Sequence, residues 1–510
     1  MLQPGFIVTK LESCFNKIVF KIIMHYSISL SVITTMMKYS FLFITLAIAI
    51  AISSCRKDDA IDTDNNLKLS FSQDTILFDT VFTTIGSATQ VLKIYNPSEN
   101  KINISSIRLG KGSDSPYRFN VDGISSLEIT DLELQGNDSA FVFVKVTIDP
   151  NEANTPLVHQ DSLVFVTNNN TQDVKLVAWG QDAYFYNRAI IGSDYVFEAD
   201  KPHVIYNYLV VDSLYTLEIL AGAHIHLHPG AFILVYNSAS LKVKGTAEQP
   251  VIIEGDRLED YYKTLPGQWG RIWLYAGSVN NEIDYAIIRN GETGIQVDTV
   301  GNSTNPTLRI NNSIIHNMTG IGLLAQGTSV EARNCVFANC GSYTVALTLG
   351  GSYDFRHCTI GNYWRNYQRN SGLVLNNYYI DINENLQSRL LEKAYFGNCV
   401  IYGDNTDELT LDQAPSTATF NYLFDHCLIK TTLPLSDPEH FINTIRNQEP
   451  WFKDPLLAEF EPDSTLSAVI NKGSLDVINT SNFDLTKDLK QRSRISDTAP
   501  DLGAYEFEER

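Results

Sequence analysis

One five-residue pattern occurs six times in the second half of this 510-residue chain: DYAII (284–288), NNSII (311–315), RNCVF (333–337), RHCTI (356–360), GNCVI (397–401) and DHCLI (425–429). The small central residues stand at positions 286, 313, 335, 358, 399 and 427, so the intervals between them are 27, 22, 23, 41 and 28 residues. A unit of about 22 residues with occasional insertions is the size of one rung of a β-helix, in which each turn stacks on the previous one. The repeat therefore predicts a parallel β-helix.

The residues around the small position indicate which side chains face the interior. Side chains two apart in a strand share a face, so the small residue and the apolar residue two positions later both point inward. Apolar residues also stand three positions earlier, and these can point inward only if a two-residue bend intervenes. Asn312, Asn334 and Asn398 occupy the second bend position, replaced by His357 and His426 in two rungs, and Asn tolerates the left-handed backbone of a tight bend. A second asparagine column, at 290, 317, 339 and 362, predicts the next turn.

This register also accounts for the cysteines that follow Cys55. Four of the five fall in the interior column, at 335, 358, 399 and 427, and the fifth is Cys340. Stacked strands lie about 4.8 Å apart with parallel side chains, which keeps the Cβ atoms farther apart than the roughly 3.8 Å that a disulfide prefers. We therefore expect five buried free thiols that pack as small hydrophobic groups.

The sequence on either side of the repeat resembles secreted bacterial β-helix proteins of the pectin-lyase-like type. The stretches that carry this resemblance are 217–255, 268–297, 450–455 (PWFKDP), 466–473 and 500–506 (PDLGAYE). The resemblance implies a right-handed parallel β-helix at 203–436, followed by a C-terminal tail or cap at 437–510. It is specific for the fold and says little about activity, because this fold hosts many functions.

A different pattern precedes the repeat, at 67–182. Short alternating strands such as VLKIYN (91–96) and FVFVKVTI (141–148) are separated by Asn, Gly and Pro turns, which predicts a β-sandwich. Its strand patterns resemble the ASH/Hydin-like immunoglobulin-type domain. The overall expectation is an all-β chain in which an Ig-like sandwich is followed by the β-helix.

The N-terminal region predicts export and lipid attachment. Residues 37–54 contain a short charged start and an apolar run too short for a stable membrane span, as in a signal peptide. The run ends in Ser53-Ser54-Cys55, which resembles a bacterial lipobox and implies acylation of Cys55, hence a lipid anchor in the outer membrane. Residues 1–36 fit no role and are expected to be a misassigned start, whereas the polar stretch 55–66 is expected to be a tether.

Two further signals favour display on the outer surface of a bacterial cell. The sequence after Cys55, Arg56-Lys57-Asp58-Asp59, resembles the export tag of Bacteroidetes surface lipoproteins. Asp followed by Ser or Thr and a small or aliphatic residue resembles the O-glycosylation sequon of the same group, although Asp-Ser and Asp-Thr are also common turn pairs. This triplet gives candidate sites at Thr75, Thr80, Ser139, Ser162, Ser213, Thr299, Ser464 and Thr498.

Composition and motifs exclude several function classes. The chain has 58 acidic and 38 basic residues, a balance that would repel nucleic acid, so no nucleic-acid partner is expected. No phosphate-binding or dinucleotide-binding loop is present, and we predict no cofactor. Enzymes with this fold place catalytic groups on the outward face of the strand after the asparagine turn. There we expect an outward column of Gln296, Gly322, Ala346 and Val374, with Asp298 as a lone carboxylate. Glycoside hydrolysis needs two carboxylates, so no catalytic residues are assigned.

Two residue clusters remain as candidate binding sites. His224, His226 and His228 alternate and are all expected to face solvent, but no acidic or cysteine third ligand is evident, so no metal site is predicted. In the insertion at 361–369, exposed Tyr363, Trp364, Arg365 and Tyr367 would make a surface for stacking on sugar rings. The alternative is that these aromatics seal the side of the solenoid.

These observations favour a surface lipoprotein that presents a β-helix for binding or adhesion, with polysaccharide as ligand and without catalysis. The alternative is a polysaccharide lyase or glycoside hydrolase with a non-standard active site.

Overall fold

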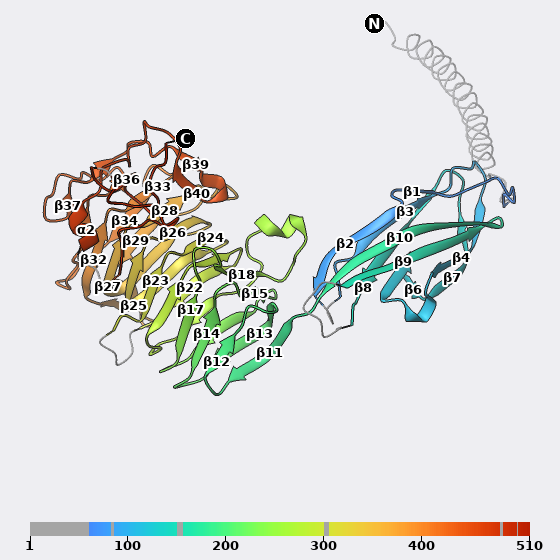
Figure 1. Ribbon diagram of the computed structural model, residues 1–510, viewed down its shortest axis with the longest axis horizontal. Helices are drawn as coiled ribbons and strands as arrows, with labels where there is room; N and C mark the ends of the chain where they lie inside the picture. The colour runs from blue at the N-terminus through green and yellow to red at the C-terminus, as the bar shows by residue number, and fades with distance from the viewer. Residues whose placement is uncertain are drawn as a thin grey trace, which may run out of the picture. The chain divides into compact units, whose positions relative to one another are not determined.

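The computed structural model describes residues 61–82, 86–149, 157–299, 305–479, 483–496 and 498–509 (Figure 1). Their regular structure is almost entirely β, with short helices only. The predicted all-β class is therefore confirmed. Within these residues no helix has the length and apolar character needed to span a bilayer. The segment 1–36, the signal peptide at 37–54 and Cys55 lie outside the described residues.

The first structural unit along the chain is a β-sandwich of two five-stranded sheets. One sheet has the order β1 (Ser70–Phe71), β3 (Gln90–Tyr95), β8 (Ser139–Val146), β5 (Tyr117–Val121) and β6 (Ile124–Ser126). The other has the order β2 (Thr75–Phe82), β10 (Asn170–Gln181), β9 (Leu157–Thr167), β4 (Ile102–Leu109) and β7 (Glu128–Leu134). Burial alternates along β8, as expected for strands with one face in the core. The end of the predicted tether is bound to this unit, because the Asp62 amide donates to the Lys101 carbonyl at 2.6 Å.

The second unit is a right-handed parallel β-helix with 26 strands, β11 to β38 without the hairpin β30–β31. Strand pairing resolves it into three ladders, which we call I, II and III. Ladder I contains β12 (Tyr195–Phe197), β14 (Thr216–Leu220), β17 (Ser240–Lys244), β20 (Asn281–Asp284), β23 (Leu308–Asn311), the later parts of β25 (Ile321–Arg333) and β27 (Val345–Arg356), β32 (Leu391–Gly397), β35 (Leu423–Asp425) and β37 (Phe441–Ile442).

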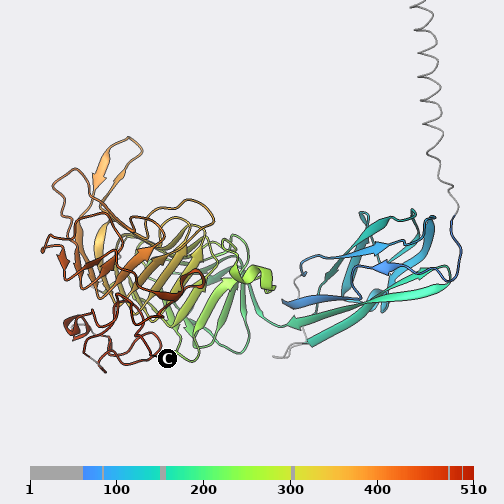
Figure 2. The ribbon, with the colours of Figure 1, turned by 90° about the horizontal axis from the view of Figure 1, so that it is seen from above.

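Ladder II contains the first part of β13 (His203–Val211), β15 (His224–Leu227), β18 (Val251–Gly255), β21 (Ala286–Arg289), β24 (Ile314–Met318), β26 (Val336–Cys340), β28 (Thr359–Asn362), β33 (Val400–Gly403), β36 (Leu428–Ile429) and β38 (Ile445–Arg446). Ladder III contains the second part of β11 (Tyr184–Ile191), the second part of β13, β16 (Phe232–Val235), β19 (Ile272–Leu274), β22 (Thr293–Val297), the first parts of β25 and β27, β29 (Leu373–Asn376) and β34 (Leu409–Asp412). The first part of β11 pairs with the first part of β13 and so belongs to ladder II. The stacked rungs are visible edge-on in Figure 2.

The parallel sheet begins at Tyr184, about one rung before the predicted start at 203. The residues of β11 and β12 carry neither the small-residue column nor the asparagine bend, so the repeat did not reveal them. Pairing also extends to Arg446, slightly beyond the predicted end at 436.

The bend between ladders I and II follows the predicted column. Asn312, Asn334, His357, Asn398 and His426 all have a positive φ of 45 to 51°. In the second column, the residues at 290, 317 and 339 have positive φ, but Asn362 does not. Asn362 instead ends β28, where its buried side chain bonds to the backbone of Cys340. Its different role coincides with the insertion that follows it.

The interior positions are also confirmed. The small-residue column and its apolar neighbours two positions later and three positions earlier are all fully buried. Phe355, Phe396 and Phe424 stack in the core, with ring centroids 5.2 and 4.8 Å apart. The five cysteines are buried free thiols, as predicted.

The tail after β38 turns back along the outside of ladder II. It contains β39 (Phe452–Asp454), a 3-10 turn (Pro455–Leu457), β40 (Glu459–Pro462) and α2 (Leu475–Asn479). Its apolar side chains, including Phe460, Leu502 and Tyr505, pack on outward residues of β26, β33 and β36. Asparagines of both bends bind it through backbone carbonyls: Asn339 to Pro455 at 2.7 Å and Asn398 to Ser474 at 2.9 Å. The tail therefore covers one side of the helix.

Candidate binding surface on ladder III

The outward face of ladder III carries aromatic side chains on three successive rungs. They are Tyr208 on β13, Phe232 on β16, Tyr236 just after β16, Trp273 on β19 and Tyr275 just after β19. None of the five is buried, and Tyr236 is 42% exposed. We call these residues the aromatic surface. Their neighbours Ile233, Val235, Ile272 and Leu274 point into the core, because side chains alternate along a strand.

The rings of the aromatic surface contact one another from rung to rung. Tyr236 and Tyr275 stack at 5.4 Å with an interplanar angle of 20°, and Trp273 meets Tyr275 edge-on at 5.6 Å. Tyr208 and Phe232 lie 6.0 Å apart. Such contacts restrict ring motion, so the surface is ordered before any ligand arrives.

Polar groups border the aromatic surface: Gln296 on β22, Asp298 just after β22, and Arg271 just before β19. The indole nitrogen of Trp273 donates to Asp298 Oδ2 at 2.7 Å, and Gln296 Nε2 donates to Asp298 Oδ1 at 2.9 Å. Arg271 donates to Gln296 Oε1 at 2.6 Å and lies over the Trp273 ring at 5.8 Å. Hydrogen-bonding groups thus stand beside partly exposed rings, the combination by which a protein surface binds a sugar hydroxyl and a sugar face together.

The observed strand register after β22 differs from the outward column that the sequence predicts. In the observed register Gln296 stands beside Leu324, then Ala346 and Val374, so Leu324 takes the place predicted for Gly322. Gly322 lies two residues earlier, opposite Gly294. The difference arises because β22 and β25 pair at an offset of 28 residues, beginning with Thr293 opposite Ile321, whereas Gly322 beside Gln296 would require an offset of 26.

The next outward column shows how the carboxylates of this face are spaced. It runs from Asp298 through Gln326, Thr348 and Asn376 to Asp412. Asp298 and Asp412 are therefore four rungs apart, roughly 19 Å at the usual strand spacing. A pair of hydrolytic carboxylates stands about 5 to 10 Å apart, so these two residues do not form one.

A groove of about 630 Å³ opens one residue beyond this column, at the corner between ladders III and I. Its lining includes Thr299, Ser329, Tyr379, Arg389 and Glu392. Arg389 lies over the Tyr379 ring at 5.3 Å and donates to its hydroxyl at 3.2 Å. Tyr379 belongs to the hairpin formed by β30 (Tyr378–Ile380) and β31 (Leu386–Ser388). The volume is in the range that accommodates a small ligand.

The insertion at 361–369 does not present the exposed aromatics expected from the sequence. Trp364 is only 7% exposed, and Tyr363 packs against the tail residue Phe460. Tyr367 is 51% exposed, but its ring covers Trp364 at 5.2 Å. Arg365 is exposed and pairs with Asp404 at 2.7 Å. The expectation that Trp364 is exposed is therefore wrong, and Tyr363 is only partly exposed, because the insertion folds back onto the solenoid.

A buried ion pair fixes the end of this insertion. Arg369 donates to both oxygens of Glu408, at 2.6 and 2.8 Å, and both side chains are almost fully buried. Glu408 also accepts from the amides of Gly372 and Asn405. Burial raises the pKa of Glu408, while Arg369 opposes that rise. The pair therefore anchors the end of the insertion to the solenoid.

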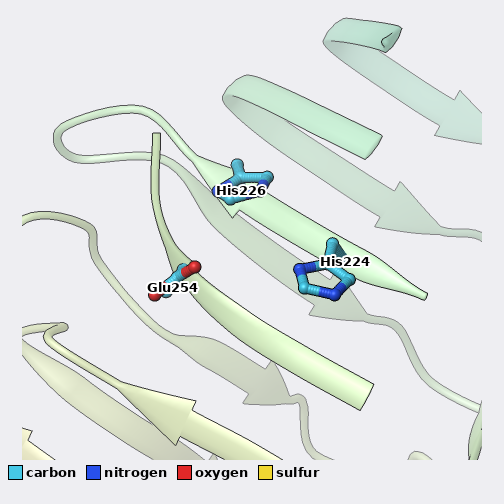
Figure 3. Close-up of side chains that lie close together, drawn as sticks. All are labelled: His224, His226 and Glu254. Atoms are coloured by element: carbon cyan, nitrogen blue, oxygen red, sulfur yellow. The ribbon is translucent and has the colours of Figure 1, made fainter. Parts of the chain in front are cut away.

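The histidines of β15 differ from the expectation in two respects. His224 and His228 are exposed, but His226 is only 4% exposed. An acidic neighbour is also present, since Glu254 on β18 lies close to His224 and His226 (Figure 3). The sequence did not suggest this carboxylate because it lies a full rung away along the chain.

The candidate glycosylation residues are accessible wherever their side chains are described. Thr299 and Thr498 are exposed, and Thr75, Ser139, Ser162, Ser213 and Ser464 are partly exposed. Thr80 lies in β2, but its side chain is outside the described set.

Sequence patterns could have indicated the aromatic surface. The strands FILVY (232–236) and WLY (273–275) carry large side chains at outward as well as inward positions, which an ordinary solvated strand does not.

Comparison with known proteins agrees with the strand topology. Residues 233–360 match the family model described as a right-handed β-helix region. No curated protein sequence matches the chain. Among solved structures, the pectate lyase Pel9A is similar at 11% identity over 64% of this chain and 88% of that chain, with a TM-score of 0.24.

Two further solved structures are similar at the same low level. A GH87 α-1,3-glucanase from Streptomyces thermodiastaticus shares 11% identity over 70% of this chain and 88% of that chain, with a TM-score of 0.22. A protein of unknown function from Porphyromonas gingivalis shares 12% identity over 25% of this chain and 60% of that chain, with a TM-score of 0.17. The matched segment 233–360 is thus a right-handed β-helix region within an all-β chain.

Proposed function

We propose that this protein is an exported, lipid-anchored protein that binds polysaccharide along ladder III without cleaving it. The observation that carries the proposal is the aromatic surface: five partly exposed rings on three adjacent rungs, with Arg271, Gln296 and Asp298 at their border. Such a strip extends along the solenoid axis, and an extended glycan chain could lie on it.

The chemistry of this surface fits a neutral or weakly charged glycan. Ring faces contact the apolar faces of sugar rings, while the amide, guanidinium and carboxylate groups exchange hydrogen bonds with hydroxyls. Because these polar groups already bond to one another, they are held in place and lose little entropy on binding.

The spacing of carboxylates favours binding over hydrolysis. Asp298 and Asp412 stand too far apart to act on one glycosidic bond, and Asp298 already accepts two hydrogen bonds from Trp273 and Gln296.

A second candidate function is polysaccharide cleavage in the groove at the corner of ladders III and I. The groove brings the Arg389 cation beside the Tyr379 hydroxyl, with Glu392 also in the lining. Elimination from a uronate requires a base beside a cation, and these groups supply both kinds.

One binding experiment tests the main proposal. The full-length protein would be screened against immobilised polysaccharides, and the best ligand titrated against Tyr236→Ala and Trp273→Ala. Each loss of a ring should weaken affinity by about 1–2 kcal/mol, or roughly tenfold. Phe141→Ala removes an exposed ring from the sandwich and serves as the matched control, with unchanged affinity expected. Equal affinity of all variants would reject the aromatic surface as the site.

A product assay on the same polysaccharides separates the two candidates. Bound glycan without new reducing ends or unsaturated products supports binding alone. Product formation that Arg389→Met abolishes would instead establish cleavage in the corner groove.

The proposed location of the protein in the cell rests on the sequence alone. Cys55→Ala should abolish membrane retention. Replacing Lys57, Asp58 and Asp59 by Ala should leave the protein bound to the outer membrane but facing the periplasm. Protease treatment of intact cells measures the second effect, and equal digestion of both forms would remove the export-tag interpretation.

A further inference from the structure

Three potential metal ligands meet on the outward face of ladder II, away from ladder III. His224 and His226 lie on β15, and Glu254 lies on β18 in the next rung. The two strands pair in parallel with His226 directly opposite Glu254. One ligand atom from each of the three side chains lies within 4.8 Å of the others, and Figure 3 shows the three groups facing the same space.

We propose that His224, His226 and Glu254 form a binding site for a divalent transition metal, with Zn²⁺ as the best fit. Two imidazoles and one carboxylate are the ligand set of open zinc sites, in which a fourth position is left for water or another ligand. The same set discriminates against Mg²⁺ and Ca²⁺, which prefer oxygen ligands alone. The site is independent of glycan binding on ladder III.

The hydrogen bonding of His226 prepares it for this role. Its Nδ1 lies 3.0 Å from the carbonyl oxygen of Gly255, and a carbonyl can only accept. Nδ1 must therefore carry the proton, which leaves Nε2 with a free lone pair. A backbone carbonyl bound to the second ring nitrogen is the usual way in which a metal-binding histidine is oriented.

Glu254 is oriented in a similar way. Arg289, on β21 in the following rung, donates to Glu254 Oε2 from Nε at 2.8 Å and from Nη2 at 2.7 Å. Both contacts use the same oxygen. Among the described residues no hydrogen bond to Oε1 is recorded, so that oxygen is available to a metal ion. The guanidinium holds the carboxylate but also reduces the local negative charge, which should give moderate rather than very tight metal affinity.

His224 supplies the third ligand and is exposed. It stands two residues before His226 on the same face of the strand, with the rings 6.3 Å apart and 27° from parallel. His228 is two residues further on, but its Nδ1 bonds to Asp256 at 2.7 Å. His228 is therefore engaged with a different carboxylate, and it provides a matched control on the same strand.

Isothermal titration of the full-length protein with Zn²⁺ tests the proposal. We expect one saturable site, and we expect His224→Ala and Glu254→Gln each to raise Kd at least tenfold. His224 is exposed, so its replacement should leave folding intact. His228→Ala should change Kd by less than threefold. Saturating Zn²⁺ should raise the Tm of the wild type and of His228→Ala but not that of His224→Ala.

Four outcomes would overturn the site. The first is the absence of saturable binding in the wild type at Zn²⁺ concentrations up to about 100 times the protein concentration. The second is equal affinity of the wild type and His224→Ala, and the third is an equal loss in His228→Ala and His224→Ala. Equal binding of Mg²⁺ and Zn²⁺ would also contradict it, since the imidazoles would then play no part.

Discussion

Ladders II and III both carry large apolar side chains on their outward faces, and these faces differ in exposure. On the later rungs of ladder III the outward Ala346 and Val374 are buried, but the outward rings on its earlier rungs are not. On ladder II, Val336, Val400 and Leu428 are buried beneath the C-terminal tail. On ladder III, the rings of Tyr236, Trp273 and Tyr275 remain partly exposed. An outward apolar residue in a solenoid therefore indicates that something packs on it. On ladder II this is the chain itself, and on ladder III we propose that it is a ligand.

The largest expected effect on stability comes from a substitution that breaks the contact between the C-terminal tail and ladder II. Arg494 is fully buried, donates to Glu506, and also bonds to Asn334 and Gly503. Arg494→Met would leave the buried Glu506 without its charged partner and should lower the free energy of unfolding by about 3–5 kcal/mol. Urea denaturation measures the loss. Lys242→Met, which breaks a surface pair with Glu282, should cost under about 1 kcal/mol and serves as the control.

Hydrogen exchange would show where that loss occurs. Exchange in Arg494→Met should rise in β26, β28 and β33 of ladder II and stay unchanged in β16 and β19 of ladder III. A uniform rise in both ladders would contradict the view that the tail protects ladder II specifically.

The next largest effect on stability is expected from a substitution in the insertion at 361–369, which connects ladder II to ladder III. Trp364 is buried and covered by Tyr367, so Trp364→Ala should open a cavity and lower stability by about 3 kcal/mol. Glycan affinity should stay unchanged at temperatures where the variant is folded. A tenfold loss of affinity with an unchanged melting curve would restore the insertion as a sugar-binding surface.

A bend beneath the tail should make stability depend on pH. His357 is fully buried, and its Nε2 lies 2.9 Å from the Asn398 side-chain nitrogen, so a neutral ring suits the site. Burial lowers the pKa of His357 well below its usual value. A pKa depressed in the folded state contributes stability above about pH 6.5, and this is lost as pH falls, by at most roughly 1.4 kcal/mol per pH unit.

Replacing His357 with the residue of the equivalent bends tests this dependence. His357→Asn reproduces the side chain of Asn312, Asn334 and Asn398, all of which have the same left-handed backbone. The variant should lose less stability than the wild type between pH 6.5 and 5, as measured by urea denaturation across that range. Identical pH profiles would show that protonation of His357 is not responsible.

Substitutions in the aromatic surface of ladder III should give the smallest change in stability. Tyr236 is 42% exposed and contacts mainly Tyr275, so Tyr236→Ala should alter the free energy of unfolding by less than about 1 kcal/mol while weakening glycan binding. A loss of 3 kcal/mol or more would mean that the aromatic surface supports the fold instead, as the covered face of ladder II does.

The predicted core agrees closely with the structure, whereas the exposure predicted for Trp364 and His226 does not. A core position repeats every rung, so Cys358 and its equivalents could be identified by alignment of the chain with itself. Trp364 lies in an insertion without a repeat, and its burial depends on Tyr367 and on the way the loop folds back. Glu254 lies opposite His226 because the two residues are one rung apart along the chain. Since the number of residues in a rung varies along the chain, the sequence does not show which residues of neighbouring rungs lie opposite each other.

The sequence by itself determined the fold class, the inward columns, the free thiols and the asparagine bends, because each is dictated by local spacing and by the backbone preferences of single residues. Only the tertiary structure decided which outward faces are covered, which residues of neighbouring rungs stand side by side, and that the tail returns along ladder II. These features depend on contacts between segments far apart in the chain. Side-chain patterns fix the direction in which a residue points, but not what it meets there.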